Sequence, residues 1–451
     1  MLSARTLPVS PPPTHRNPPI PEPSGPDPSG GTRPRPAAVL GVLLTLVAVV
    51  AAACSSTPTG APSATSSTAA APSSSTIPTT STATSTTSAD GLPAIRHVFV
   101  IVLENEGYTT TFGTPSNDPY LASTLPAHGA LLTEYFGIGH FSNDNYVALI
   151  SGQAPNPLNQ SDCIQFVNFP ATATVASDGQ IDDSGCVFPT SVTTVANQLS
   201  AAHLTWKGYM QDMGNIPTRE SPVCGHAGIG TPDRTQKAVP GDGYAARHDP
   251  FVYFHSIIDN TTYCDAHVVP LGTTTGTLPA GTPTGTTGLA TDLRSVSTTP
   301  NLSVITPNLC NDGHDSPCIN QPGSASPLVN IDAFLQTWVP LITGSPAVKK
   351  VGLLEVTFDE ADVDGGPADA TACCNEMPGP AAALPGITGP GGGRIGTVLI
   401  SPFIRGGTVS TVPYNHYSTL ATIEDLFGLP KLGQARTVSA TFGRDVFTGA
   451  G

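Results

Sequence analysis

Four short, continuous runs of apolar residues constrain the fold of this chain more than any other feature of its sequence. They are His97–Leu103, Leu302–Thr306, Val351–Phe358 and Ile395–Ser401. A run without polar alternation is typical of a strand in a parallel sheet that is covered on both faces. Stretches with helical character lie between or beside the runs, at Asn145–Ser151, Ser191–Ala201, Asn330–Ile342 and Thr419–Phe427. This alternation predicts an α/β fold with a mostly parallel sheet, helices on both faces and loop insertions.

Polar side chains follow three of these runs at the point where each run ends. They are Glu104 and Asn105, then Asp312, His314 and Asp315, and finally Asp359 and Glu360. The carboxyl ends of parallel strands meet at one edge of a sheet, and ligands bind beyond that edge. Acids that are merely solvated would explain one such cluster but explain three poorly. We therefore expect these side chains to converge on a binding site.

The segment from Gly139 to Gly152 carries the most specific local pattern. Ser142 stands where a helix should begin, and Gly152 stands where that helix should end. A serine in this place has two interpretations. As a helix cap it contributes about 1 kcal/mol of stability. As a nucleophile it attacks phosphorus while the helix amides hold the phosphate oxygens. Taken alone, the position favours the cap.

The first ninety residues differ in composition from a folded domain. Residues 1–36 are crowded with proline and predict a disordered extension. Arg33 and Arg35 precede an apolar run that ends at Cys54, which is the layout of an export signal. We interpret 37–54 as a signal or lipoprotein segment, because three alanines before Cys54 resemble a lipoprotein processing site. An uncleaved membrane anchor or plain secretion is the alternative.

A linker rich in Ser, Thr, Pro and Ala follows over residues 55–91. Residues 92–451 then form one large α/β domain. We expect the chain to be exported and anchored to the cell membrane through Cys54, or else secreted. Cleavage before Cys54 would leave 14 basic and 31 acidic residues, a formal charge of −17. Because nucleic-acid binding needs a basic face, this balance argues against nucleic acid as a partner.

Nine cysteines are present, and setting Cys54 aside leaves an even number. An even number suits disulfide bonds in an oxidising compartment. The spacing suggests the pairs Cys163–Cys186, Cys224–Cys264, Cys310–Cys318 and the vicinal Cys373–Cys374. The alternative is a metal cluster, but the chain lacks the paired CxxC spacing that such clusters use.

Several ordered blocks of the sequence resemble the bacterial phosphoesterase family, which includes phospholipase C enzymes and acid phosphatases. The blocks are HVFVIVLENEGY, HFSNDNYVALISG, WKGYMQDM, YAARHDPFVYF, TPNLCNDGHD, VTFDEADVDGG and YNHYSTLATIEDLFGLP. The similarity runs from about Arg96 to Leu432 in the family's order. It implies an alkaline phosphatase-like fold, because that family belongs to the alkaline phosphatase superfamily, and a metal-dependent hydrolase of phosphate esters over residues 92–451.

The resemblance also implies a role for individual residues. The catalytic residues would be Ser142 as nucleophile, with His314 or His416 protonating the leaving group. A divalent metal ion would bind Glu104, Asn105, Ser142, Asp312, Asp359 and Glu360. The substrate would contact Asn105, His140, Asn145 and His248. Such oxygen ligands suit Mg, Ca, Mn or Zn, and the sequence does not choose among them.

Two departures from the family pattern lie close to the predicted nucleophile. Family members often place proline beside the serine, in a Pro-Ser-Leu-Pro-Asn arrangement, whereas Phe141 precedes Ser142 here and Asn143-Asp144 follows it. Glu106 stands where histidine or arginine is common. We expect an acid phosphatase-like phosphomonoesterase acting on a small-molecule or lipid phosphate ester. The alternatives are a phospholipase C or other phosphodiesterase, and a surface binding protein that has lost catalysis.

Overall fold

The computed structural model describes residues 91–361 and 369–448. The predicted disordered extension, signal segment and all but the last residue of the predicted linker lie outside these ranges. Among the helices that lie within them, none combines the length and the apolar character that a bilayer crossing requires.

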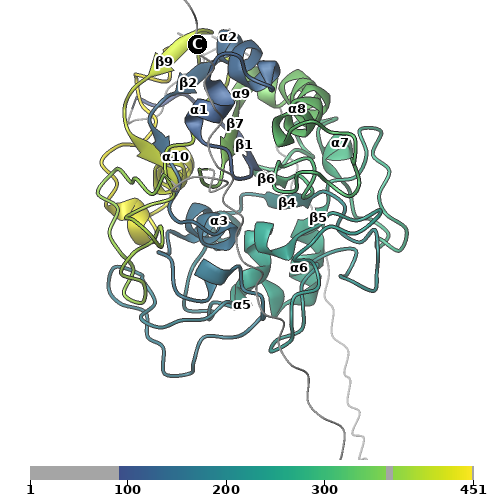
Figure 1. Ribbon diagram of the computed structural model, residues 1–451, viewed down its shortest axis with the longest axis vertical. Coiled ribbons are helices and arrows are strands. Elements are labelled where there is room, and N and C mark those ends of the chain that lie inside the picture. The colour runs from purple at the N-terminus through teal and green to yellow at the C-terminus, as the bar shows by residue number, and fades with distance from the viewer. Residues whose placement is uncertain (1–90, 362–368, 449–451) are drawn as a thin grey trace, which may run out of the picture. The chain divides into compact units, whose positions relative to one another are not determined.

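An eight-stranded sheet forms the centre of the described domain (Figure 1). Its strand order is β5-β4-β6-β1-β7-β8-β2-β9. The strands are β1 His97–Leu103, β2 Ala130–Leu132, β4 Trp206–Met210, β5 Val268–Pro270, β6 Leu302–Thr306, β7 Gly352–Phe358, β8 Thr397–Ile400 and β9 Thr408–Ser410. Neighbours pair in parallel except where β8 meets β7 and β2. A separate pair joins β3 (Tyr135–Phe136) to β10 (Tyr414–Asn415) in parallel.

The four predicted apolar runs are strands β1, β6, β7 and β8, so the predicted α/β class with a mostly parallel sheet is confirmed. Every residue of β1, β6 and β7 is buried, which explains why these runs show no polar alternation. Two details differ from the prediction. Val351 ends a short helix instead of starting β7, and β8 runs antiparallel to its neighbours.

Helices lie on both sides of the sheet. They are α1 Tyr108–Phe112, α2 Leu125–His128, α3 Ser142–Ser151, α4 Val195–Ala201, α5 His255–Ile258, α6 Thr261–His267, α7 Leu289–Asp292, α8 Pro327–Gly344, α9 Val348–Val351 and α10 His416–Phe427. Short turns of other helix types occur at η1 Tyr120–Thr124, η2 Asn159–Ser161, η3 Ala246–His248, η4 Pro250–Tyr253 and η5 Gly433–Arg436. The link from β2 to β4 and the link from β6 to β7 cross the sheet in opposite directions. Right-handed crossovers therefore place α3 and α8 on opposite faces (Figure 1).

Helix α3 is the central helix of its face and packs against α10, although the two are far apart in the sequence (Figure 1). All ten residues of α3 are buried. The helix ends at Gly152, whose φ of 70° is the left-handed conformation that a helix end favours and that glycine adopts without strain. This end was predicted. The fold thus fixes Ser142, the first residue of α3, beside the carboxyl edge of the sheet.

Four disulfide bonds join the cysteine pairs that the spacing suggested. They are Cys163–Cys186, Cys224–Cys264, Cys310–Cys318 and Cys373–Cys374. The predicted pairing is confirmed, including the vicinal pair. A chain with this many disulfide bonds belongs in an oxidising compartment, which indicates a location outside the cytoplasm.

Candidate active site

A cavity of about 600 Å³ opens beyond the carboxyl ends of β1, β6 and β7. Its lining includes five of the residues predicted to bind metal or substrate or to act in catalysis: Asn105, His140, Ser142, His314 and Glu360. These residues come from segments that are up to 255 positions apart, between Asn105 and Glu360. The predicted convergence on one sheet edge is what the structure shows.

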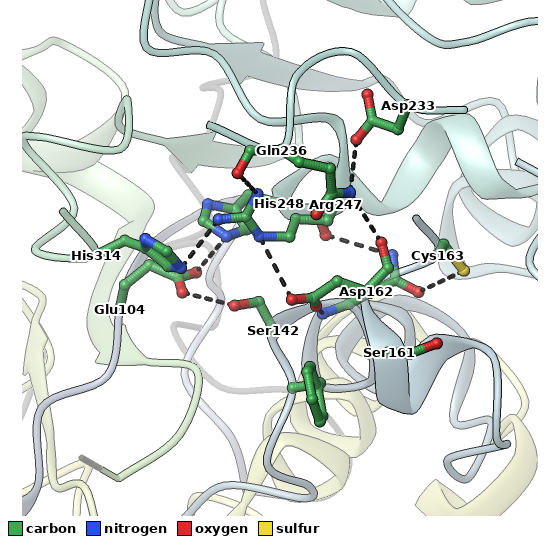
Figure 2. Close-up of polar contacts among 12 residues, drawn as sticks. Glu104, Ser142, Ser161, Asp162, Cys163, Asp233, Gln236, Arg247, His248 and His314 are labelled. Carbon is green, nitrogen blue, oxygen red and sulfur yellow. Dashed lines mark hydrogen bonds and ion pairs between the residues drawn. The ribbon is translucent and has the colours of Figure 1, made fainter. Parts of the chain in front are cut away.

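The Ser142 hydroxyl points at the buried carboxylate of Glu104 (Figure 2). Its Oγ donates a hydrogen bond of 2.8 Å to Oε2 of Glu104, and the Tyr146 hydroxyl donates one of 2.6 Å to Oε1. Ser142 and Tyr146 are four residues apart on α3, so their side chains share one face of the helix. The residue that caps α3 is Phe141, not Ser142. The serine therefore faces the acidic cluster and does not serve as the cap.

Asp359 follows the last residue of β7 and lies beside the end of β1. Its Oδ1 accepts hydrogen bonds from the backbone N–H groups of Asn105, at 3.0 Å, and Glu360, at 2.7 Å. Its Oδ2 is buried and has no hydrogen-bond partner among the described residues. Asn105 has a φ of 61°, an uncommon conformation for a residue other than glycine, and its side-chain amide donates to Oε2 of Glu104 at 3.2 Å. One Asp359 oxygen is thus left for another partner.

Two histidines flank Glu104 on the side of β6 (Figure 2). His248 has its Nε2 3.4 Å from Oε1 of Glu104 and its Nδ1 3.2 Å from Oδ2 of Asp312. The His248 ring stacks on Tyr146, with ring centroids 5.3 Å apart. His314 has Nδ1 2.8 Å from Asp315, and its backbone N–H donates to Oδ1 of Asp312. Both Asp312 oxygens are engaged, so Asp312 orients the two histidines from behind.

The charges of this cluster fit a divalent cation. Burial, followed by repulsion from Asp359, raises the pKa of Glu104 and of Glu360 well above the usual range. Burial also raises the pKa of Asp359 to about 6. Burial, followed by the nearby Arg247 charge, lowers the pKa of His248, and the neutral imidazole is the form that binds metals. Carboxylates crowded in this way are unfavourable without a compensating positive charge.

Donor atoms from Glu104, His248 and His314 lie within 4.8 Å of one another, a spacing that suits one metal ion. Two of these three residues were predicted for other roles, His248 for substrate contact and His314 for catalysis. The predicted oxygen donors of Asp359 and Glu360 lie next to this group. Among the described residues, the donors close enough to share one ion are therefore Glu104 and the two imidazole nitrogens, and the Asp359 and Glu360 carboxyl groups add negative charge beside them.

His140 and Asn145 shape the wall of the cavity. The Asn145 side chain accepts hydrogen bonds from the backbone of Ile138 and Gly139 and donates one of 3.2 Å to Oε2 of Glu360. It therefore holds the loop before α3, which is a different task from the predicted substrate contact. His140 lines the cavity, and its Nδ1 lies 4.0 Å from Oε2 of Glu360.

His416 lies beneath the site instead of facing the cavity. Only 1% of its surface is exposed, its Nε2 is 2.7 Å from the backbone oxygen of Asp359, and its Nδ1 is 3.3 Å from the Tyr135 hydroxyl. Burial lowers its pKa to about 4. Both ring nitrogens are engaged, so this arrangement supports the Asp359 backbone and leaves the predicted proton transfer to another group.

Sequence reasoning missed three residues of the site, Tyr146, Asp162 and Arg247. Tyr146 follows Ser142 by one helical turn, and Arg247 precedes His248 in the block YAARHDPFVYF, so both positions carried a signal. Asp162 is adjacent to Cys163 of a predicted disulfide bond, which gave no indication of a role in the site.

The chain matches the model of the Phosphoesterase family over residues 116–430, which include Ser142, Asp312, His314, Asp359 and Glu360. It is 27% identical over 318 residues to the phosphate-repressible acid phosphatase of Penicillium chrysogenum, covering 69% of this chain and 55% of that protein. It is 25% identical over 348 residues to the phosphatidylinositol-3-phosphatase of Mycobacterium tuberculosis, covering 77% and 82%. This chain thus spans about half the length of the fungal phosphatase.

A solved structure of a protein in the alkaline phosphatase superfamily, from Vibrio parahaemolyticus, aligns with a TM-score of 0.43 and 14% identity. The alignment covers 75% of this chain and 67% of that one.

Proposed function

Because the chain belongs to the Phosphoesterase family and is thus a hydrolase acting on phosphoric ester bonds, we propose that it cleaves phosphate monoesters with Ser142 as nucleophile. The proposal includes a divalent metal ion in the acidic cluster around Glu104. The observation that carries it is the hydrogen bond of 2.8 Å from Ser142 Oγ to Glu104, at the cavity and amid buried carboxyl groups.

The chemistry assigns a task to each part of the cluster. A serine hydroxyl is a weak nucleophile at neutral pH and needs a partner that removes or stabilises its proton. Oε2 of Glu104 already accepts that proton in a hydrogen bond. A cation held by Glu104, Asp359 and Glu360 would lower the pKa of the hydroxyl and offset the charge of the phosphoryl group.

The reaction then proceeds in two displacements. Ser142 Oγ forms a bond to phosphorus, the P–O bond to the alcohol breaks, and a phosphoserine results. Water then attacks the phosphoserine and gives a proton to His314, the bond between phosphorus and Ser142 Oγ breaks, the serine oxygen takes back its proton from Glu104, and inorganic phosphate leaves. The leaving alkoxide takes a proton from His314, because that histidine lines the cavity, whereas His416 is buried beneath Asp359. The His314 Nε2 lies 2.9 Å from Arg247 Nη2, and His314 must give up this contact to protonate the leaving group.

The choice of monoesters draws on two relatives. The names of the Penicillium and Mycobacterium proteins both describe removal of a phosphate group. Phosphatidylinositol-3-phosphatase acts on a lipid headgroup, as its name states, so the substrate of this chain is either a soluble ester or a lipid. We further propose that Cys54 carries a lipid anchor, which would hold the domain near such headgroups. Cys54→Ser should move the chain from the membrane fraction to the medium.

Phosphate release from three substrates tests the function. They are nitrophenyl phosphate, its bis-ester and phosphatidylcholine, each with a divalent metal supplied. The proposal expects turnover of the monoester and loss of about three orders of magnitude in Ser142→Ala. Ser151→Ala is the matched control, because Ser151 is a buried serine of the same helix whose Oγ donates to Val147. Preference for a diester would replace the monoesterase assignment, and no turnover of any ester would support a binding protein.

A further inference from the structure

The Asp162 carboxylate bridges two groups that are suited to bind a phosphate (Figure 2). Its Oδ1 accepts a hydrogen bond of 3.1 Å from the backbone N–H of Asn143. Its Oδ2 lies 3.6 Å from Nε of Arg247. Asp162 also lines the same cavity as Ser142. A negatively charged group of this chain therefore occupies the space beside the proposed nucleophile.

The Asn143 amide belongs to the residue directly after Ser142, in the first turn of the ten-residue helix α3. Amides in a first helical turn have no acceptor within the helix, and together with the helix dipole they attract anions. A phosphoryl group bonded to Ser142 Oγ would lie next to this N–H. The Asp162 Oδ1 atom, which accepts the hydrogen bond from this N–H, thus occupies the position expected for an oxygen of the phosphoryl group.

Arg247 is a buried cation, and one of its three guanidinium nitrogens has no hydrogen-bond partner among the described residues. Only 1% of its surface is exposed, its Nη1 donates to the Gln236 carbonyl and its Nη2 lies 2.9 Å from Nε2 of His314. Its Nε has no hydrogen-bond partner in the described part of the chain, because Asp162 is too distant for one. A buried donor without an acceptor is unfavourable, and a phosphoryl oxygen would form the charge-assisted bond that is missing.

The Asp162 side chain can change its rotamer while its backbone stays in position. Cys163, the next residue, is bonded to Cys186, and the Asp162 carbonyl accepts from Gln236. The side chain itself keeps 17% of its surface exposed toward the cavity. A change of rotamer would therefore move the carboxylate out without moving the loop.

From these contacts we propose that the Asp162 carboxylate mimics the substrate. It occupies the phosphoryl position between Asn143 N–H and Arg247 until the phosphate ester displaces it. The inference rests on the proposed function, because it takes Ser142 as the residue that receives phosphorus. A ligand must outcompete a carboxylate for one amide and one guanidinium. The dianionic phosphoryl group of a monoester does this better than the single charge of a diester, which makes Asp162 a specificity-determining residue.

Binding of inorganic phosphate to the metal-loaded full chain tests the inference without turnover. Isothermal titration should give a Kd that falls about fivefold or more in Asp162→Asn and Asp162→Ala, because the internal competitor is weakened or gone. Arg247→Ala should raise the Kd about tenfold or more, because a charge-assisted bond is lost. Asp178→Asn, which removes one charge from an exposed loop, is the matched control and should leave the Kd unchanged.

A second readout separates displacement from a merely structural role. In steady-state assays Asp162→Asn should lower KM for nitrophenyl phosphate and raise the relative rate on the bis-ester. An unchanged or weaker phosphate affinity in both Asp162 variants would overturn the inference, because Asp162 would then only orient Arg247. Asp162→Asn keeps an acceptor for the Asn143 amide, so it remains informative even where the alanine variant unfolds. Failure of the serine mechanism would appear separately, as turnover that survives Ser142→Ala.

Discussion

Leu103 at the end of β1 and Phe358 at the end of β7 are paired in register in the parallel sheet. The next residues along each strand, Glu104 and Asp359, therefore leave the sheet at the same level. Two buried carboxyl groups are brought together by strand register alone, before any loop contributes. This pairing explains how Glu104 and Asp359, which are 255 residues apart, build one acidic cluster.

Neutralising Glu104 should remove the metal and the activity together. Glu104→Gln keeps the shape of the side chain but loses the charge that any cation in the cluster would contact. We expect kcat/KM to fall by about three orders of magnitude, with a matching loss of bound metal measured by elemental analysis. Glu424→Gln is the control, since Glu424 is a buried glutamate of α10. Full metal content with low activity would remove Glu104 from the ligand set.

Chelation should destabilise the protein at neutral pH. Burial raises the pKa of Glu104, Asp359 and Glu360, and repulsion from Asp359 raises the pKa of Glu104 and Glu360 further. A bound cation relieves that repulsion, so its removal should lower the melting temperature, and added metal should restore it in proportion to concentration. Differential scanning fluorimetry with and without chelator measures the change. An identical melting temperature in both conditions would contradict the metal assignment.

His314→Gln should slow the release of poor leaving groups more than good ones. A nitrophenolate leaves without protonation, whereas an alkoxide needs a proton, so the loss should reach about two orders of magnitude only for alkyl phosphates. His416→Gln is the paired comparison and should show no such dependence on the leaving group. Loss of metal from His314→Gln would instead make His314 a metal ligand, as its spacing with Glu104 and His248 allows.

Glu355→Gln should change how stability depends on pH. Burial raises the pKa of Glu355 on β7 from 4.5 to about 7 in the folded chain, although Thr419 and Tyr135 donate hydrogen bonds to it. A raised carboxyl pKa means that the folded state holds its proton more tightly, so stability is lost as pH rises from 4.5 through 7. As the pH rises through that window, the free energy of unfolding of the wild type should fall by about 3 kcal/mol relative to that of the glutamine variant. Urea unfolding at several pH values measures both. A difference that stays constant with pH would contradict this.

The central strands and the convergence of acids on one sheet edge could be predicted from the sequence, because β1, β6 and β7 are buried on both faces and read as unbroken apolar runs. The direction of β8 could not, since an apolar run has no orientation. Strand β4 was missed because Lys207 and Gly208 interrupt its apolar pattern. The Lys207 ammonium is paired with Asp292 at 2.7 Å, a contact that only the folded chain reveals.

The finer geometry of the site depends on contacts that no local pattern encodes. His416 was predicted, as the alternative to His314, to protonate the leaving group because it lies in a family block, yet it begins α10 after the Asn415 capping box and its ring lies beneath Asp359. Asp162 reaches Arg247 because of a loop that the Cys163–Cys186 bond holds in place. Family resemblance thus indicated segments that meet at the cavity, whereas the orientation of each side chain came from tertiary packing.

Trapping the covalent intermediate tests the central claim most directly. Metal-loaded enzyme is mixed with nitrophenyl phosphate, quenched in acid within the first turnovers, digested and analysed by mass spectrometry. We predict phosphate on the peptide that contains Ser142, and its absence in Ser142→Ala together with loss of turnover. Full turnover by Ser142→Ala would contradict a seryl nucleophile.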